Sequence, residues 1–77
     1  KRQVIIKRVR ENAPKSIENV KVVRLDIQDG FRFILSDHSW LLIRFSGTEP
    51  ILRIYAETND TERVKRMLQF GRELAGV

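Results

Sequence analysis

Two segments of the chain have the apolar spacing of an amphipathic helix. In residues 2–12 apolar side chains recur every four residues, and charged side chains fill the other positions. Pro14 is expected to end this helix, because the residue before a proline avoids helical backbone angles. The second helix follows Asn59, which forms a capping-box pattern with Glu62, and Gly76 suits its C-cap. Its apolar stripe, which we interpret as core, consists of Val64, Met67, Leu68, Gly71, Leu74 and Ala75.

Between these helices, four segments have the composition of β-strands, and we assign them to residues 20–27, 31–35, 40–45 and 51–57. The pair Asp29-Gly30 fits a tight hairpin turn, because glycine adopts a positive φ without strain. Residues 36–39 form a second predicted turn, since Ser and Asp side chains bond their own backbone. Residues 15–19 are interpreted as a polar connector between the first helix and the first strand.

The order helix, four strands, helix predicts an α+β fold. Short connections favour antiparallel neighbours, so we expect a two-layer sandwich in which two helices cover one face of a four-stranded antiparallel sheet. The alternation of side chains supports this arrangement. One set on the last two strands is apolar, and it comprises Leu41, Ile43, Phe45, Leu52, Ile54 and Ala56. The opposite set mixes aromatic and charged residues, as expected of a face that meets a ligand or another domain: Trp40, Leu42, Arg44, Arg53, Tyr55 and Glu57.

Length and composition limit the possible functions. The 77 residues are enough for one small domain, which we assign to residues 1–77 and expect to be part of a larger protein. The chain has no cysteine and one histidine, so disulfides, zinc knuckles, thiol catalysis and a two-histidine relay are excluded for it. No apolar run approaches the ~20 residues of a membrane-spanning helix. The lack of cysteine fits a reducing compartment, and we expect a cytoplasmic protein.

The positive charge is concentrated at the start of the chain. The formal net charge is +5, and residues 1–15 contain six basic residues and one acidic residue. Such a segment fits a solvated helix face or a face that pairs with an acidic domain. It also leaves open contact with an anionic membrane surface, and a stand-alone basic module that binds nucleic acid through this segment or through the sheet face of Trp40 and Tyr55. Aromatic residues do not interleave with the basic run, so no base-stacking platform is visible there.

The segment 44–50, followed by Arg53, carries the most chemistry. Gly47 permits a positive φ and a close approach of the backbone to a ligand, and successive N–H groups in such a turn can bind an anion. Ser46 and Thr48 add hydroxyl donors, and Arg44 offers a planar fork to phosphate oxygens. Arg53 and Glu57 lie on the same strand face as Arg44, and either could orient Arg44 or complete the site. An ordinary polar hairpin loop remains the alternative interpretation of the same residues.

Residues 44–57 resemble the C-terminal-domain signature of the α-D-phosphohexomutases, which include phosphoglucomutase, phosphomannomutase and phosphoglucosamine mutase. The resemblance extends to Asp29-Gly30, to Ser39-Trp40 and to the last helix. It implies a small domain of the TATA-binding-protein-like type. It also implies that the substrate's phosphate is bound by Arg44, Ser46, Gly47 and Thr48, with Glu49 and Pro50 shaping the loop and Arg53 supporting it. Phe45 and His38 depart from the family pattern, which often has proline and glycine at these positions.

In this family a phosphoserine of the first domain donates its phosphoryl group to a hexose monophosphate, and a bisphosphorylated sugar forms. Magnesium, held by aspartates, assists. This chain has neither the phosphoserine motif nor the aspartate cluster, so we expect no catalytic or metal-binding residue on it. The resemblance implies an isomerase whose other three domains complete the site. This chain would bind the non-reacting phosphate of the hexose phosphate and close over the substrate cleft of the whole enzyme. We expect the isolated chain to be inactive, and we expect it to contact neither nucleic acid nor membrane.

Overall fold

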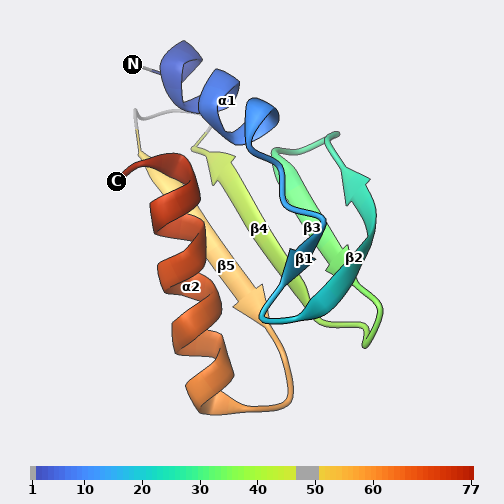
Figure 1. Ribbon diagram of the computed structural model, residues 1–77. Coiled ribbons are helices and arrows are strands. Elements are labelled where there is room, and N and C mark those ends of the chain that lie inside the picture. Colours follow the sequence, from blue (N-terminus) through green and yellow to red (C-terminus); the bar gives the residue numbers. More distant parts are fainter. Residues whose placement is uncertain (1, 47–50) are drawn as a thin grey trace.

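The computed structural model describes residues 2–46 and 51–77. Two helices and five strands follow one another along these residues (Figure 1). Their order is α1 (Arg2–Glu11), β1 (Ser16–Ile17), β2 (Val20–Asp26), β3 (Phe31–Leu35), β4 (Trp40–Phe45), β5 (Leu52–Glu57) and α2 (Thr61–Ala75). The predicted α+β order is confirmed, and β3 and β4 have the predicted bounds.

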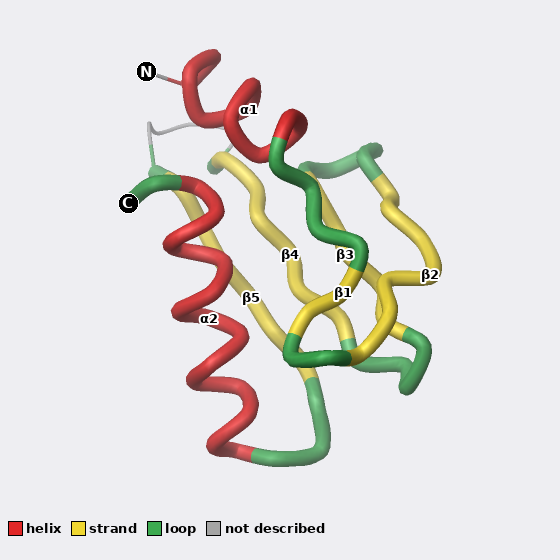
Figure 2. The backbone as a smooth tube through the Cα atoms, in the orientation of Figure 1, coloured by secondary structure: helices red, strands yellow, loops and turns green. Residues whose placement is uncertain are grey.

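The sheet has five strands in the part of the chain that the structure describes, so the prediction of four is wrong. The strand order is β1-β2-β3-β4-β5, and each neighbouring pair is antiparallel. The additional strand, β1, lies in the segment interpreted as a connector (Figure 2). Glu18 and Asn19 form the turn to β2 with φ values of 54° and 66°. Positive φ at both central residues suits a two-residue hairpin, but Glu-Asn lacks the glycine that usually signals one.

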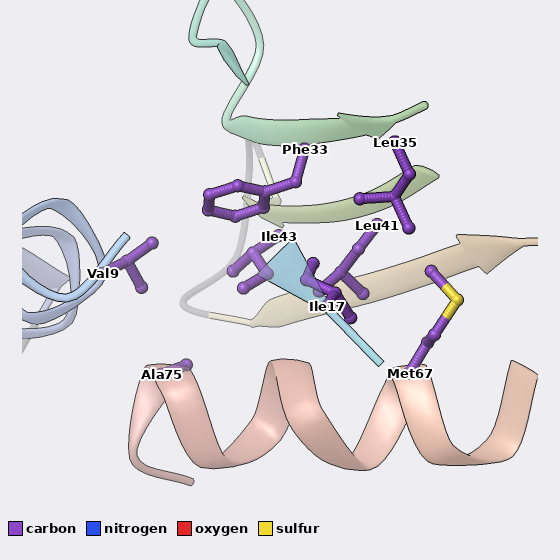
Figure 3. Close-up of a cluster of buried hydrophobic side chains, with 8 residues drawn as sticks. All are labelled: Val9, Ile17, Phe33, Leu35, Leu41, Ile43, Met67 and Ala75. Atoms are coloured by element: carbon purple, nitrogen blue, oxygen red, sulfur yellow. The ribbon is translucent and has the colours of Figure 1, made fainter. Parts of the chain in front are cut away.

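Both helices contribute to a core on one face of the sheet, as expected. Figure 3 shows the side chains of Met67 and Ala75 of α2 directed toward the strands, with Val9 of α1 at the Ala75 end of the cluster. The buried cluster comprises Val9, Ile17, Phe33, Leu35, Leu41, Ile43, Met67 and Ala75. Of the predicted stripe of α2, Met67 and Ala75 are in the core, Gly71 is buried and Leu74 packs against the cluster. Ile17 belongs to the same core, which the sequence did not predict.

The opposite face of the sheet carries the mixed aromatic and charged set, which confirms the predicted alternation. Arg44 lies opposite Arg53, and Trp40 lies opposite Glu57. The guanidinium of Arg32 lies over the Trp40 ring, 5.3 Å from its centroid, in a cation–π contact.

The helix ends show one confirmed cap and one correction. Gly76 ends α2 with a φ of 81°, and its N–H donates to the Arg72 and Glu73 carbonyls. The N-cap of α2 is Asp60, whose carboxylate accepts from the Glu62 N–H at 3.0 Å, so the capping box from Asn59 is wrong by one residue. An Asp side chain caps as well as an Asn, and the sequence Asn-Asp offers both in succession.

Candidate functional site

Several elements meet at one end of the sheet: the last residues of β4, the first of β5, the β2–β3 turn and α1 (Figure 1). A cavity of about 340 Å³ lies there between α1, the turn and the end of β4. Its lining includes three arginines, Arg2, Arg10 and Arg44, and one carboxylate, Asp29. We call Arg2, Arg10, Arg44 and Arg53 the cationic end of the molecule. This excess of positive charge favours an anionic ligand.

Arg44 is held at two points by the β2–β3 turn. Its Nη1 donates to Asp29 Oδ2 at 2.9 Å. Gly30, with a φ of 101°, lies so close that a Cβ there would come within 2.5 Å of the Arg44 Cβ. The Arg44 Nε is buried and has no acceptor among residues 2–46 and 51–77.

The pairing of Arg44 with Arg53 also favours an anion. The two residues are direct cross-strand partners between β4 and β5. Like charges in directly opposite positions are destabilising. An anion between or beside the two guanidinium groups removes this repulsion, whereas a cation increases it.

Ser46 follows β4 directly, and its side chain is buried, with the residue 7% exposed. Its backbone N–H donates to the Ile51 carbonyl at 2.8 Å, which joins the two ends of the loop between β4 and β5. The predicted phosphate-loop residues Gly47 and Thr48, and the supporting residue Glu49 with Pro50, lie outside the described residues. The predicted nest of backbone N–H groups therefore stays a prediction.

The sequence predicts Asp29 and Gly30 as a turn that is part of the family resemblance, but it does not pair them with Arg44. The contact follows from the register between β3 and β4, in which Phe31 pairs with Ile43, and from the close approach of Gly30 to Arg44. The pattern of residues alone does not fix this register. Sequence reasoning also missed a contact of Phe45, whose ring centre lies 4.9 Å from the Arg2 guanidinium carbon. The Phe45 ring thus gives α1 a cation–π contact at the end of β4.

The other end of the sheet carries an internal ion-pair network. Asp37, in the β3–β4 turn, accepts from Arg63 Nη1 of α2 at 2.6 Å, and Arg63 also donates to Thr58 Oγ1 at 3.0 Å. The hydrogen bond from Arg63, aided by the Ser39 N–H, lowers the pKa of the Asp37 carboxyl to about 2. The neighbouring His38 is exposed and has a φ of 74°, a conformation that glycine adopts more readily than histidine. These groups connect the turn to the start of α2.

The basic start of the chain is partly used within the molecule. Arg8 donates to the Leu74 and Glu73 carbonyls at 3.0 and 3.2 Å, near the C-terminus of α2. A cation at this position also interacts favourably with the helix dipole. Together with the cation–π contact of Arg2, this bonding gives two of the basic side chains internal roles. The nucleic-acid alternative is not favoured.

In the described part of the chain, no three His, Cys, Asp or Glu side chains are grouped so that they could hold a metal ion. No helix among the described residues is long and apolar enough to cross a membrane.

The fold and the site define a class of small α+β domains that present arginines at one end of an antiparallel sheet, beside the loop between its last two strands. The chain belongs to the phosphoglucomutase/phosphomannomutase family, since the family model of its C-terminal domain matches residues 5–74. The resemblance of residues 44–57 to this family is therefore confirmed.

Relatives of the chain carry the names of several phosphosugar mutases. A phosphoglucomutase/phosphomannomutase of Thermococcus kodakarensis is 38% identical over 73 residues, which are 95% of this chain and 15% of that protein. A probable phosphoglucosamine mutase of Methanosphaera stadtmanae is 37% identical over 73 residues, 95% of this chain and 16% of that protein. A phosphopentomutase of T. kodakarensis is 43% identical over 59 residues, 77% of this chain and 13% of that protein. No solved structure matches the chain significantly.

Proposed function

We propose that this chain is the C-terminal domain of a phosphohexomutase and that its cationic end binds the phosphate group that is not being transferred. The longer enzyme is then an isomerase that interconverts hexose 1-phosphate and 6-phosphate through a phosphoserine and a bisphosphorylated sugar. The observation that carries the proposal is the placement of Arg44 opposite Arg53, next to the loop that begins at Ser46. Membership of the mutase family supports it.

Each residue of the proposed site has a role that follows from its chemistry. Arg44 supplies a planar fork for two phosphate oxygens, and Arg53 adds a second positive charge on the same face. Ser46 and Thr48 supply hydroxyl donors, Gly47 and Thr48 supply backbone N–H donors, and Glu49 shapes the loop. Since relatives include mutases of hexose, hexosamine and pentose phosphates by name, the phosphate is the group that such domains can recognise in common.

The proposed role for the domain is to position the substrate and not to react with it. Binding energy from the non-reacting phosphate holds the sugar in either orientation, and closure of the domain excludes water from the reacting end. The chain spans about 15% of the length of its T. kodakarensis phosphoglucomutase/phosphomannomutase relative. We therefore place the phosphoserine, the magnesium ion and its ligands in the other three domains, and expect the isolated domain to be inactive. A TATA-binding-protein-like fold is part of the same proposal.

Replacement of Arg44 tests the proposal directly. We expect Arg44→Ala to weaken the binding of inorganic phosphate and of glucose 1-phosphate roughly tenfold to a hundredfold, because a hydrogen bond to a charged group contributes about 1.5–3 kcal/mol. The measurement is an NMR titration of the 77-residue chain that follows the amides of Ser46 and of the loop after it. In the longer enzyme the same substitution should lower kcat/KM by a similar factor.

Arg24→Ala is the matched control, because Arg24 is an exposed arginine of β2 whose cross-strand partner is Ile34 of β3. It removes the same charge and leaves Arg44 in place, so phosphate binding should remain close to that of the wild-type chain. Equal losses in the two variants would show that only net charge matters. If Arg44→Ala bound phosphate as tightly as the wild-type chain, Arg44 would not be part of the phosphate site.

A further inference from the structure

The β2–β3 turn contacts Arg44 at two places, near its Cβ atom and at its guanidinium group. The absence of a side chain at Gly30 lets the turn approach β4, since a Cβ there would lie 2.5 Å from both the Arg44 Cβ and the Ile43 carbonyl oxygen. One residue earlier, the Asp29 carboxylate accepts from Arg44 Nη1 at 2.9 Å. The arginine is thus fixed at its base by close packing and at its tip by an ion pair.

The ion pair contributes little to the stability of the fold. The Asp29 side chain is 79% exposed and the Arg44 side chain is 36% exposed. Exposed ion pairs of this kind typically stabilise a protein by about 0–1 kcal/mol, because water and salt screen them. The carboxylate does, however, restrict a long side chain that faces the positive charge of Arg53 across the strands.

We propose that Asp29 is a positioning residue, which holds the Arg44 guanidinium in the orientation that receives the phosphate group of a sugar phosphate. This inference rests on the proposed function of the cationic end. A guanidinium has five N–H donors, and Asp29 engages one nitrogen, Nη1, so donors remain for phosphate oxygens. An arginine that is already oriented loses less side-chain entropy when the ligand binds.

Asp29→Asn tests the proposal in the 77-residue chain, with inorganic phosphate as the probe. The variant keeps the shape of the side chain and removes its charge. We expect phosphate to bind about three- to tenfold more weakly, which corresponds to the ordering of one flexible side chain on binding. Without phosphate, NMR relaxation of the Arg44 Nε–H group should show faster motion than in the wild-type chain. Unfolding by urea should remain close to wild type, because the carboxylate is exposed.

Glu57→Gln is the matched control. Glu57 lies on the sheet face of Arg44 but at the far end of β5, where its cross-strand partner is Trp40, and Arg44 pairs with Asp29 and not with Glu57. Its replacement changes the net charge by the same amount as Asp29→Asn. We expect wild-type phosphate affinity and an unchanged Arg44 signal in this variant. If both variants weakened binding equally, a general charge effect would replace the positioning role.

The outcomes separate this inference from the proposed function. Suppose that phosphate binds the wild-type chain at Ser46 and binds Asp29→Asn equally or more tightly. This result would overturn the positioning role of Asp29 but not the proposed function, since Asp29 would then be neutral or compete with phosphate for Arg44. No binding by the wild-type chain at phosphate concentrations well above about 1 mM, where a weak anion site is expected to fill, would overturn the proposed function and this inference with it.

Discussion

Asp37 shows how one surface carboxylate acquires an unusual ionisation. Its carboxylate accepts from Arg63 Nη1 at 2.6 Å and from the Ser39 N–H at 3.0 Å. Both donors favour the charged form, so the pKa of Asp37 falls from 3.8 to about 2. The Arg63 side chain is 13% exposed, which places the pair at the edge of the core between the β3–β4 turn and α2.

The lowered pKa predicts a dependence of stability on pH. Because the folded-state pKa lies below the unfolded value, the ion pair stabilises the protein fully above about pH 4 and the contribution is lost as the pH falls toward 2. Asp37→Asn should therefore lower the free energy of unfolding at neutral pH, and its difference from the wild type should shrink between pH 4 and pH 2.

Urea unfolding at a series of pH values measures this difference, and NMR of the Asp37 carboxyl carbon gives the pKa itself. Glu11→Gln, which removes an exposed carboxylate of α1, is the control and should not reproduce the pH dependence. A carboxyl midpoint near 3.8 for Asp37 would show that the Arg63 hydrogen bond is absent in solution.

At the scale of elements, the two ends of α2 are defined by different kinds of residue. The N-terminus uses the Asp60 side chain, which accepts from the Glu62 N–H, and the C-terminus uses the left-handed backbone of Gly76. The Gly76 cap was predictable, because glycine is the residue that adopts this conformation most readily. The N-cap was ambiguous by one residue, because Asn59 and Asp60 have equivalent side-chain acceptors.

Substitution of each candidate cap tests this assignment. Asp60→Ala should lower the free energy of unfolding by about 1 kcal/mol, the usual cost of losing an N-cap side chain. Asn59→Ala should have a smaller effect, because the Asn59 side chain does not accept from the first N–H groups of α2. Urea unfolding measures both changes. If Asn59→Ala lowered the free energy of unfolding more than Asp60→Ala did, Asn59 would be the N-cap, as the capping-box pattern predicted.

At the scale of the whole molecule, the core joins elements that are far apart in the chain. Val9 of α1, Ile17 of β1 and Met67 of α2 belong to one buried cluster with the central strands (Figure 3). A domain of this size has little surplus stability, of the order of 5 kcal/mol. The loss of one large core side chain is therefore expected to affect folding throughout the chain.

Ile17 provides the test of this expectation. Ile17 is 1% exposed, so Ile17→Ala leaves a cavity and should lower the free energy of unfolding by about 2–5 kcal/mol. Ile17→Val removes one methyl group and should lower it by about 0.5–1.5 kcal/mol. Circular dichroism during urea unfolding compares the two variants. Equal stabilities for Ala and Val at this position would contradict the packing of β1 on the core.

The sequence alone determined the features that depend on neighbouring residues. Apolar periodicity located both helices, and turn residues located β2 to β5 to within a residue or so at each end. Strand alternation placed Arg44 and Arg53 on one face, and the register between β4 and β5 confirms it. The signature in residues 44–57 indicated the family, because a match over so long a run of consecutive residues is specific.

Only the tertiary structure decided which distant residues touch. Ile17 enters the core although its strand has two residues, too few for a period to be visible. The Arg44–Asp29 ion pair and the Arg8 bond to Leu74 join positions 15 and 66 residues apart. Such contacts depend on how the sheet twists and how the helices pack on it, whereas hydrophobic periodicity and turn chemistry act within a few residues of the chain.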